Sequence, residues 1–361
     1  MGGKKKSEEK KVENASEFEV KGAEALLNYL KSNKNKINAA LASRLPSLID
    51  RIPSGVFAVD YATGGGVPVG KVSVLWGEWG STKTTLALRF AANALKMGKA
   101  GAVLWLDVEG SFNQSWAKQL GLDTDQVVVV VPSSAEEALN VIIEVGKEKV
   151  ADFIVLDSIA SLSPVVEKEK LVGEWQQGLL ARLLGQFSRK YVCDVMAAGE
   201  RVPTLLLINQ VRERIVMFGN PLTRPGGKAI GFLSSLEIRL KEAKPVEKDG
   251  QILMVEVGGV VNKNRFYKTG IEFSYRMAVA PFDRYVPGDV VEEDVVISQA
   301  KDVGFIRKEK GQYVFDGVEV EEGVEFTTLE SIKDYFLANK EKFWYFKQKL
   351  LEYLLYGNEG N

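Results

Sequence analysis

Short apolar runs alternate with helical segments through the middle of the chain. Each run spans six or seven residues and is rich in Val, Ile and Leu, which is typical of buried strands. The runs are KVSVLW (71–76), AVLWLDV (102–108), QVVVVV (126–131), DFIVLDS (152–158) and TLLLIN (204–209). Segments with helical spacing lie between them, such as TTLALRFAANALKMG and SAEEALNVIIEVGKEK. This alternation predicts an α/β fold, a mostly parallel central sheet covered by helices on both faces.

The pattern also divides the chain. Residues 1–20 are a mixed charge run, expected to be a disordered tail, and residues 21–49 predict a small helical region. Residues 50–283 form the predicted core, in which EIRLKEA, ILMVEVGGVVNKN and IEFSYRMAVAP extend the sheet. Residues 284–361, with VVISQAKDVG, GQYVFDGVEV and an amphipathic end, predict a small α+β C-terminal domain.

Composition restricts the possible catalytic groups and binding partners. The 361 residues are 45% hydrophobic and 26% charged, and no stretch reaches the roughly 18 consecutive apolar residues that a membrane span needs, so no membrane partner is expected. The chain has no histidine, so proton transfer falls to carboxylates, lysines, tyrosines or water. Its only cysteine, Cys193, fits a reducing cytoplasm and lies in an apolar helical pattern that predicts a core position. With a net charge of −1, nucleic-acid binding would require a local basic patch.

A glycine-rich segment between a predicted strand and helix has the pattern of a phosphate-binding loop. GEWGSTKT places Gly77, Lys83 and Thr84 at the positions of G-x-x-x-x-G-K-[ST]. Backbone N–H groups there would bind the phosphates of ATP, Lys83 would contact the β/γ-phosphates, and the Thr84 hydroxyl would reach Mg²⁺. Thr82 departs from the pattern, which has glycine there. The expected nucleotide-binding residues are Gly77, Glu78, Trp79, Gly80, Ser81, Thr82, Lys83, Thr84 and Thr85.

Carboxylates end two of the predicted strands. Asp157 ends FIVLD, where open α/β sheets bind ligands, and is expected to hold Mg²⁺ through water. Alone, such an aspartate is more often a helix cap; the phosphate loop favours the metal interpretation. Asp107 and Glu109 lie two residues apart, which on a strand puts them on one face. A carboxylate there would orient an attacking water, and the alternative is a solvated strand end.

The segment after TLLLIN fits neither strand nor helix. It combines Ile215, Val216, Met217 and Phe218 with several cations and ends in a glycine pair. Either it is a disordered surface loop, or its cations bind phosphates while its apolar side chains insert between bases.

These segments together resemble the RecA family of homologous-recombination ATPases, over about residues 50–283. LDVEGSFNQSWAKQLGLD resembles the segment with the catalytic glutamate, which implies that role for Glu109 and places Trp116 against adenine. LLINQVR implies that Gln210 senses the γ-phosphate. VNKNRF resembles the cap that reaches ATP across the subunit interface, which implies that role for Lys263 and Arg265.

The resemblance implies an ATP-hydrolysing recombinase that binds single- and double-stranded DNA. It implies helical filaments with ATP between subunits, and mediator or single-strand-binding proteins as further partners. Two DNA-binding loops are expected, near 165–177 and 211–228. The expected DNA-binding residues are Gln177, Arg182, Arg189, Arg212, Arg214, Met217, Phe218, Gly226, Gly227 and Lys228.

Two departures indicate a phage-type or otherwise divergent member: Thr82, and an N-terminal region unlike that of the bacterial proteins. Two other functions stay open. A hexameric helicase uses a similar phosphate loop, and a non-hydrolysing filament regulator is compatible with Thr82.

Overall fold

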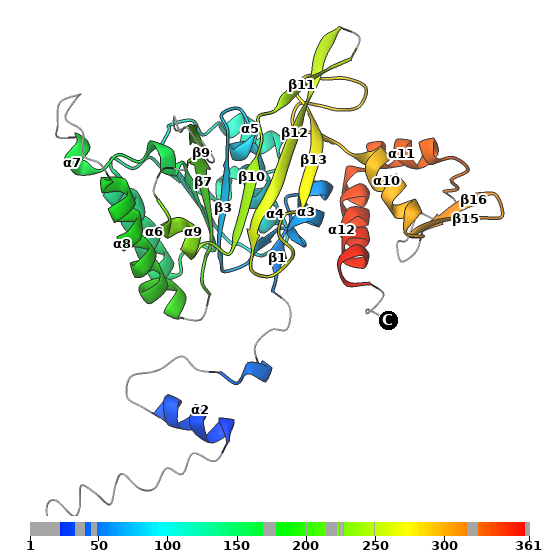
Figure 1. Ribbon diagram of the computed structural model, residues 1–361. Coiled ribbons are helices and arrows are strands. Elements are labelled where there is room, and N and C mark those ends of the chain that lie inside the picture. Colours follow the sequence, from blue (N-terminus) through cyan, green and yellow to red (C-terminus); the bar gives the residue numbers. More distant parts are fainter. Residues whose placement is uncertain are drawn as a thin grey trace, which may run out of the picture.

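The computed structural model describes residues 22–32, 40–44, 49–168, 178–198, 201–213, 222–223, 225, 227–248, 250–315 and 324–357. Within this part of the chain the molecule has a central sheet with helices on both faces (Figure 1). The predicted fold class is therefore confirmed.

The central sheet has ten strands in the described part, ordered β14-β13-β12-β10-β3-β7-β6-β4-β5, with β11 paired to β12. The strands from β10 to β5 run parallel to one another, and β11 to β14 add an antiparallel extension. The strands are β3 (Val72–Gly77), β4 (Val103–Asp107), β5 (Val127–Val130), β6 (Phe153–Asp157), β7 (Thr204–Gln210), β10 (Leu236–Leu240), β11 (Lys244–Lys248), β12 (Gln251–Asn264), β13 (Glu272–Ala278) and β14 (Val290–Val291).

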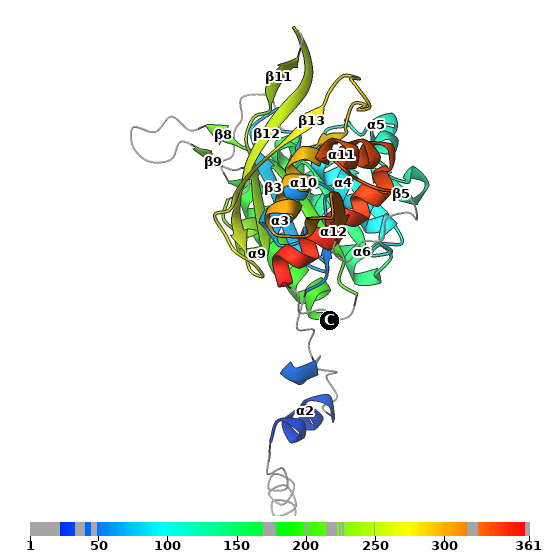
Figure 2. The same ribbon diagram turned by 90° about the vertical axis from the view of Figure 1, so that its right-hand side faces the viewer.

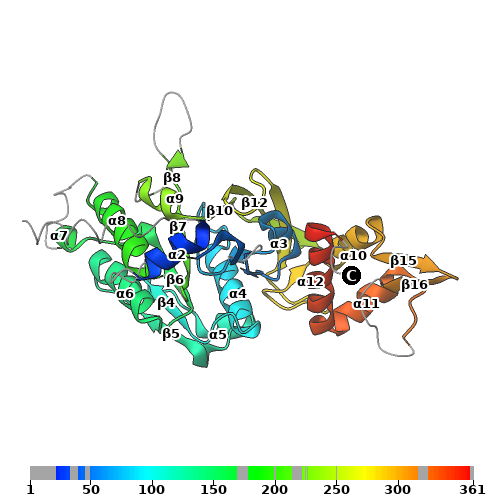
Figure 3. The ribbon, with the colours of Figure 1, turned by 90° about the horizontal axis from the view of Figure 1, so that it is seen from below.

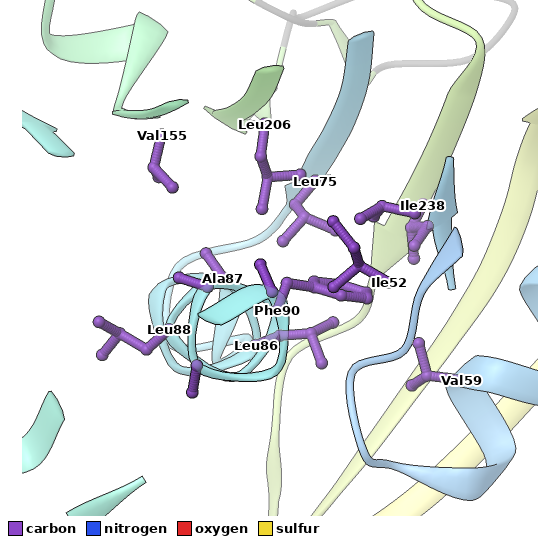
Figure 4. Close-up of a cluster of buried hydrophobic side chains, with 14 of the residues drawn as sticks. Ile52, Val59, Leu75, Leu86, Ala87, Leu88, Phe90, Val155, Leu206 and Ile238 are labelled. Carbon is purple, nitrogen blue, oxygen red and sulfur yellow. The ribbon is translucent and has the colours of Figure 1, made fainter. Parts of the chain in front are cut away.

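Helices bury an apolar stripe against each face of the sheet. On one face lie α3 (Phe57–Thr63), α4 (Lys83–Lys96) and α5 (Gln114–Gln119). Figure 4 shows Leu86 and Phe90 of α4 packed with Leu75 and Ile238 of the sheet. On the other face lie α6 (Ala135–Glu148), α8 (Leu179–Lys190) and α9 (Ala229–Leu233). Near-continuous apolar strands are what a sheet covered on both faces requires.

The C-terminal unit has its own core, formed by α10 (Glu293–Asp302), β15 (Ile306–Glu309), β16 (Gln312–Phe315), α11 (Leu329–Ala338) and α12 (Lys340–Tyr356). It lies at the end of the molecule opposite α8 (Figures 1 and 3). Phe57 of α3 enters this core, and the Lys347 ammonium bonds Glu292 and the Gly55 carbonyl. The Phe57 side chain and the Lys347 hydrogen bond to the Gly55 carbonyl thus connect the two units.

Shorter elements complete the described part. They are α2 (Ala23–Ser32), η2 (Ala42–Arg44), β1 (Arg51–Ile52), β2 (Val67–Pro68), η3 (Thr124–Gln126), η4 (Ile159–Ser161), α7 (Val165–Lys168), η5 (Tyr191–Val195), η6 (Met196–Ala198), β8 (Arg212–Glu213) and β9 (Leu222–Thr223). Helix α2 lies apart from the main body in two perpendicular views (Figures 1 and 2). No helix in the described part is long and apolar enough to cross a membrane.

Two predictions about burial are wrong. The run QVVVVV forms β5, but β5 is an edge strand, and Val128 is 60% exposed. An apolar run does not reveal whether a further strand follows it in the sheet. Cys193 is exposed rather than buried. It lies in the π-helical turn η5, where Tyr191 and Val195 face the core and direct Cys193 outward.

Candidate functional site

The predicted phosphate loop connects the end of β3 to the start of α4. Gly77 has no room for a side chain, because a Cβ there would lie 2.1 Å from the Leu240 carbonyl oxygen on β10. Gly80 has a φ of 71°, in the left-handed region that glycine adopts without strain. Trp79, between the two, is 84% exposed at the tip of the loop. Both glycines are therefore required by backbone geometry, and the helix N-terminus points its free N–H groups at the loop.

Thr82, the departure from the glycine pattern, adopts the glycine conformation. Its φ is 60° and its ψ is 23°, in the left-handed region, which is strained for a β-branched residue. The Thr82 hydroxyl lies 3.1 Å from the Tyr275 hydroxyl on β13. The side chain is thus directed at the sheet, and this contact offsets part of the strain.

Lys83 begins α4 and is folded into the loop. Its ammonium donates to the carbonyls of Gly77 (3.3 Å) and Glu78 (2.5 Å) and to the Ser81 hydroxyl (3.0 Å). Burial lowers the pKa of Lys83, and the nearby carboxylates of Asp157 and Glu109 oppose that shift. A buried cation whose described partners are neutral oxygens is suited to an incoming anion.

Thr84 and Asp157 form a pair of oxygen groups beside the loop. The Thr84 hydroxyl donates to Oδ2 of Asp157 at 2.8 Å. The pKa of Asp157 is raised to about 6, mainly by burial; the neighbouring carboxylates of Glu109 and Asp107 add to the shift, and the Thr84 hydrogen bond opposes it. A hydroxyl and a carboxylate oxygen are ligands that Mg²⁺ accepts, so both predicted metal-site residues are in one place.

Strand order brings the carboxylates together. Strands β4, β6 and β7 are parallel neighbours, with Asp107 in register with Asp157, so their C-terminal ends meet at one edge of the sheet. The predicted strand spacing does not apply to Asp107 and Glu109, because β4 ends at Asp107 and Glu109 lies beyond it. Asp107 is buried and accepts from the backbone N–H groups of Ser111 (3.0 Å) and Phe112 (2.8 Å), which closes a loop that presents Glu109. Asp107 is therefore structural, and Glu109 is the carboxylate at the site.

Three donors converge on one oxygen of Glu109. Its Oε1 accepts from Ser158 Oγ (2.6 Å), Ser161 Oγ (2.9 Å) and Gln210 Nε2 (2.9 Å). Gln210 is the last residue of β7, so the carboxylate is linked to the point where the chain enters the predicted DNA-binding segment. The two predicted catalytic residues Glu109 and Gln210 are in direct contact.

Trp116 lies beside the phosphate loop. Its indole Nε1 donates to the Thr85 hydroxyl on α4 at 3.3 Å. A Cβ added to Gly288 would lie 3.1 Å from the Trp116 ring, so this glycine lets the chain from the C-terminal side approach the ring closely. The ring is placed to form one wall of a site for a flat apolar group.

The bases of the two predicted DNA-binding loops meet. Gly227 approaches α8, since a Cβ there would lie 3.4 Å from the Ala181 Cβ, and Arg182 follows on an exposed turn. Asn209 Nδ2 donates to the Pro225 carbonyl at 3.1 Å, which joins the two ends of the second loop. Strands β8 and β9 pair antiparallel within it. Lys228 is exposed at the start of α9.

Of the other predicted DNA-binding residues, the structure describes the position of the Arg189 side chain only. Arg189 is exposed in the last turn of α8, about 12 Å along the helix from Ala181. The predictions for Gln177, Arg214, Met217, Phe218 and Gly226 lie outside the described residues, as does that for the side chain of Arg212.

Lys263 and Arg265 do lie on one side, as predicted, but both contact their own chain. The Lys263 ammonium donates to the carbonyls of Gly231 and Ser234, each at 2.6 Å. The Arg265 guanidinium donates to the Phe232 carbonyl at 2.8 Å. The two cations thus stabilise the C-terminal end of α9, the helix that follows Lys228.

A cavity of about 400 Å³ lies away from this site, between α4, the segment from Tyr285 to Glu293, and α12. Arg89 lines it and donates to the Gly288 carbonyl, the residue that also contacts Trp116. The cavity is thus a neighbour of the Trp116 ring and is separate from the phosphate loop.

Sequence reasoning missed four residues that shape the site: Ser158, Ser161, Asn209 and Tyr275. Ser158 and Ser161 are three apart directly after Asp157, a spacing that could have signalled a turn presenting two hydroxyls. Nothing local marks Tyr275, which is 193 positions from its partner Thr82.

Comparison with known proteins matches the chain to one family. The family described as the RecA N-terminal domain matches residues 26–276. The RecA protein of Mycobacteroides abscessus is 36% identical over 279 residues, which cover 77% of this chain and 77% of that protein. The RecA protein of Bifidobacterium breve is 34% identical over 279 residues, covering 77% and 68%. The crystal structure of the RadB recombinase aligns with a TM-score of 0.46 at 23% identity, covering 63% of this chain and 96% of that one.

Proposed function

The chain belongs to the RecA family, and we propose that it is an ATP-dependent recombinase that assembles on single-stranded DNA and promotes homologous pairing and strand exchange. One observation carries this proposal. The 2.9 Å hydrogen bond between Gln210 and Glu109 joins the nucleotide side of the molecule to the start of the segment expected to bind DNA. Movement of either side chain would change the position of the other. Coupling of ATP binding to DNA binding requires such a connection.

The described residues fit a nucleoside triphosphate with magnesium. The loop from Gly77 to Thr82 opens a helix N-terminus, and the buried Lys83 has only neutral oxygens as its hydrogen-bond partners there. We assign the phosphates to this loop and adenine to Trp116. Thr84 would hold the metal directly and Asp157 through water. Bound magnesium would neutralise charge on the phosphates.

Glu109 would orient the attacking water, since the chain has no histidine for that role. The hydrogen bonds that it accepts from described residues go to Oε1, so Oε2 is the oxygen that a water would meet. Gln210 would exchange its bond to Glu109 for one to the γ-phosphate. Such an exchange would act as a local switch that orders the second predicted DNA-binding loop, which follows Gln210.

DNA would bind along the meeting loops, with Arg182 and Lys228 contacting phosphates and the second loop contacting bases. In a filament, Lys263 and Arg265 would leave the carbonyls of α9 and reach ATP on the neighbouring subunit. We propose double-stranded DNA and mediator or single-strand-binding proteins as further partners. We also propose that the domain boundaries lie at residues 49/50 and 283/284.

ATP turnover with and without single-stranded DNA, together with electron microscopy, tests the proposal. A recombinase should show DNA-stimulated turnover and helical filaments. Rings that unwind duplex DNA would indicate a helicase instead. Filaments with no turnover under any condition would indicate a regulator.

A further inference from the structure

The turn after β6 places two hydroxyls at the same carboxylate oxygen. Residues 159–161 form a 3₁₀-helix, η4, in which the Ser161 N–H donates to the Ser158 carbonyl at 3.3 Å. Ser158 is the N-cap residue of this helix, and the single turn that follows brings the Ser161 hydroxyl close to that of Ser158. The two oxygens lie 3.4 Å apart, and both donate to Oε1 of Glu109.

The two serines differ from Gln210 in how firmly they are held. Ser158 is fully buried directly after Asp157, and the Val108 N–H donates to the Asp157 carbonyl at 2.8 Å. The turn is therefore fixed to the strand that leads to Glu109. Gln210 is partly exposed at the end of its strand, and the chain beyond it leaves the sheet. Three donors crowd one oxygen, which has two lone pairs, so one donor can leave with little loss.

We propose that Ser158 and Ser161 are positioning residues that hold Glu109 in its catalytic orientation while Gln210 moves between the carboxylate and the nucleotide. Without the serines, release of Gln210 would also free Glu109 to rotate. With the serines, Gln210 can move while Glu109 keeps its orientation. This inference rests on the proposed function, because it takes Glu109 as the group that orients water.

The test compares the double variant Ser158→Ala/Ser161→Ala with wild type and with two controls. Ser163→Ala is the matched control, because it removes a hydroxyl from the same segment and has no contact with Glu109 among the described hydrogen bonds. Ser161→Thr keeps the hydroxyl and should rescue. All proteins are first checked for their unfolding midpoint, so that a fold defect is recognised.

The double variant should lose about ten- to a hundred-fold in kcat, the scale of a slightly misplaced catalytic group. Its affinity for a non-hydrolysable ATP analogue, measured by calorimetry, should stay within about two-fold, because the described hydrogen bonds of the Ser158 and Ser161 hydroxyls include none to the phosphate loop. A crystal structure of the double variant should show the Glu109 carboxylate rotated, whereas Ser163→Ala should leave it in place. The kcat of each single serine-to-alanine variant should lie between those of wild type and the double variant. The kcat of Ser161→Thr should be near that of wild type.

The Glu109→Gln variant distinguishes failure of the proposed role of Glu109 from failure of the serine proposal. If that variant hydrolyses ATP normally, the proposed role of Glu109 fails and the serine proposal fails with it. If Glu109→Gln is inactive while the double serine variant keeps its kcat, the proposed function stands and the serine proposal is overturned. Equal losses in kcat and analogue affinity, or a kcat of Ser161→Thr no higher than that of Ser161→Ala, would also overturn it.

Discussion

Gln210 Nε2 donates a 2.9 Å hydrogen bond to Oε1 of Glu109, across 101 positions of sequence. Glu109 stands beyond the end of β4, and Gln210 ends β7, with β6 between these strands in the sheet. The contact joins the carboxylate beside the phosphate loop to the entrance of the second loop.

Replacing Gln210 with Ala should therefore uncouple ATP from DNA. ATP affinity should stay within about two-fold, because the side chain contacts no residue of the phosphate loop in the described structure. The increase in single-stranded DNA affinity that ATP causes should disappear, as measured by fluorescence anisotropy with and without an ATP analogue. Gln126→Ala, an exposed glutamine bonded to Asp123, is the control and should keep the increase. An increase retained in Gln210→Ala would rule out this connection.

Thr82→Gly should stabilise the protein. Relief of left-handed strain is worth about 1–2 kcal/mol, against roughly 0.5–1 kcal/mol for the greater freedom of glycine in the unfolded chain. Urea unfolding should show a net gain below about 1 kcal/mol, and ATP turnover should change because the loop is less constrained. Lys149→Gly, at another left-handed position with a φ of 56°, measures the backbone effect without a tyrosine partner. A loss in Thr82→Gly equal to that in Tyr275→Phe would mean that the hydroxyl contact outweighs the strain.

Asp60 should make stability depend on pH. It is buried, accepts from Ser54 N (2.6 Å), Ser54 Oγ (2.8 Å) and Gly55 N (2.9 Å), and burial raises its pKa to about 7, against these hydrogen bonds and the Lys347 charge. Between its unfolded pKa of about 4 and its folded value, the folded state binds more protons. The contribution of Asp60 to the free energy of unfolding is therefore fully present below about pH 4 and is lost as pH rises through about 7.

The variant Asp60→Asn isolates this effect. The free energy of unfolding of wild type minus that of the variant should be largest near pH 4 and should shrink towards pH 8. Asp302→Asn, at an exposed position, is the control for replacing a carboxylate by an amide. A constant difference for Asp60→Asn would show that the buried carboxyl does not titrate in this range.

Neutralising Arg182 or Lys228 should weaken DNA binding through the backbone. Loss of one phosphate contact should reduce the slope of log affinity against log salt by about 0.7 for single strands. Both residues are exposed near the meeting point of the loops, whereas Lys118 on α5 is exposed elsewhere and serves as the control. An unchanged slope removes the tested residue from the DNA-binding surface.

Lys263 and Arg265 should act across the subunit interface. A Lys263→Ala/Arg265→Ala protein keeps its own phosphate loop, and a Lys83→Ala protein keeps its cap, so each alone should have almost no ATPase activity. Mixed on single-stranded DNA, they should recover part of it, as a cation supplied in trans predicts. Arg276→Ala, at an exposed position of β13, is the control for loss of a strand cation. No recovery in filaments shown to contain both proteins would count against action in trans, and would leave stabilisation of α9 as the role of the two cations.

Local sequence pattern was enough to predict many of the strands and helices and the phosphate loop. The apolar runs predicted the parallel strands, helical spacing predicted α4 and α6, and GEWGSTKT predicted the phosphate loop, because each depends on residues close together in sequence. Strand ends also predicted that Asp157 and Glu109 would lie near that loop, since the C-terminal ends of parallel strands meet at one edge.

Contacts between distant segments were decided only by the tertiary structure. Strand order made β5 an edge and exposed its valines, and it placed Ser158, Ser161 and Gln210 around one oxygen of Glu109. The same packing set the Thr82 hydroxyl against Tyr275 and directed Cys193 to solvent. Sequence periodicity records which face of an element is apolar. It does not record which element lies beside it, and that neighbour determines burial and hydrogen-bond partners.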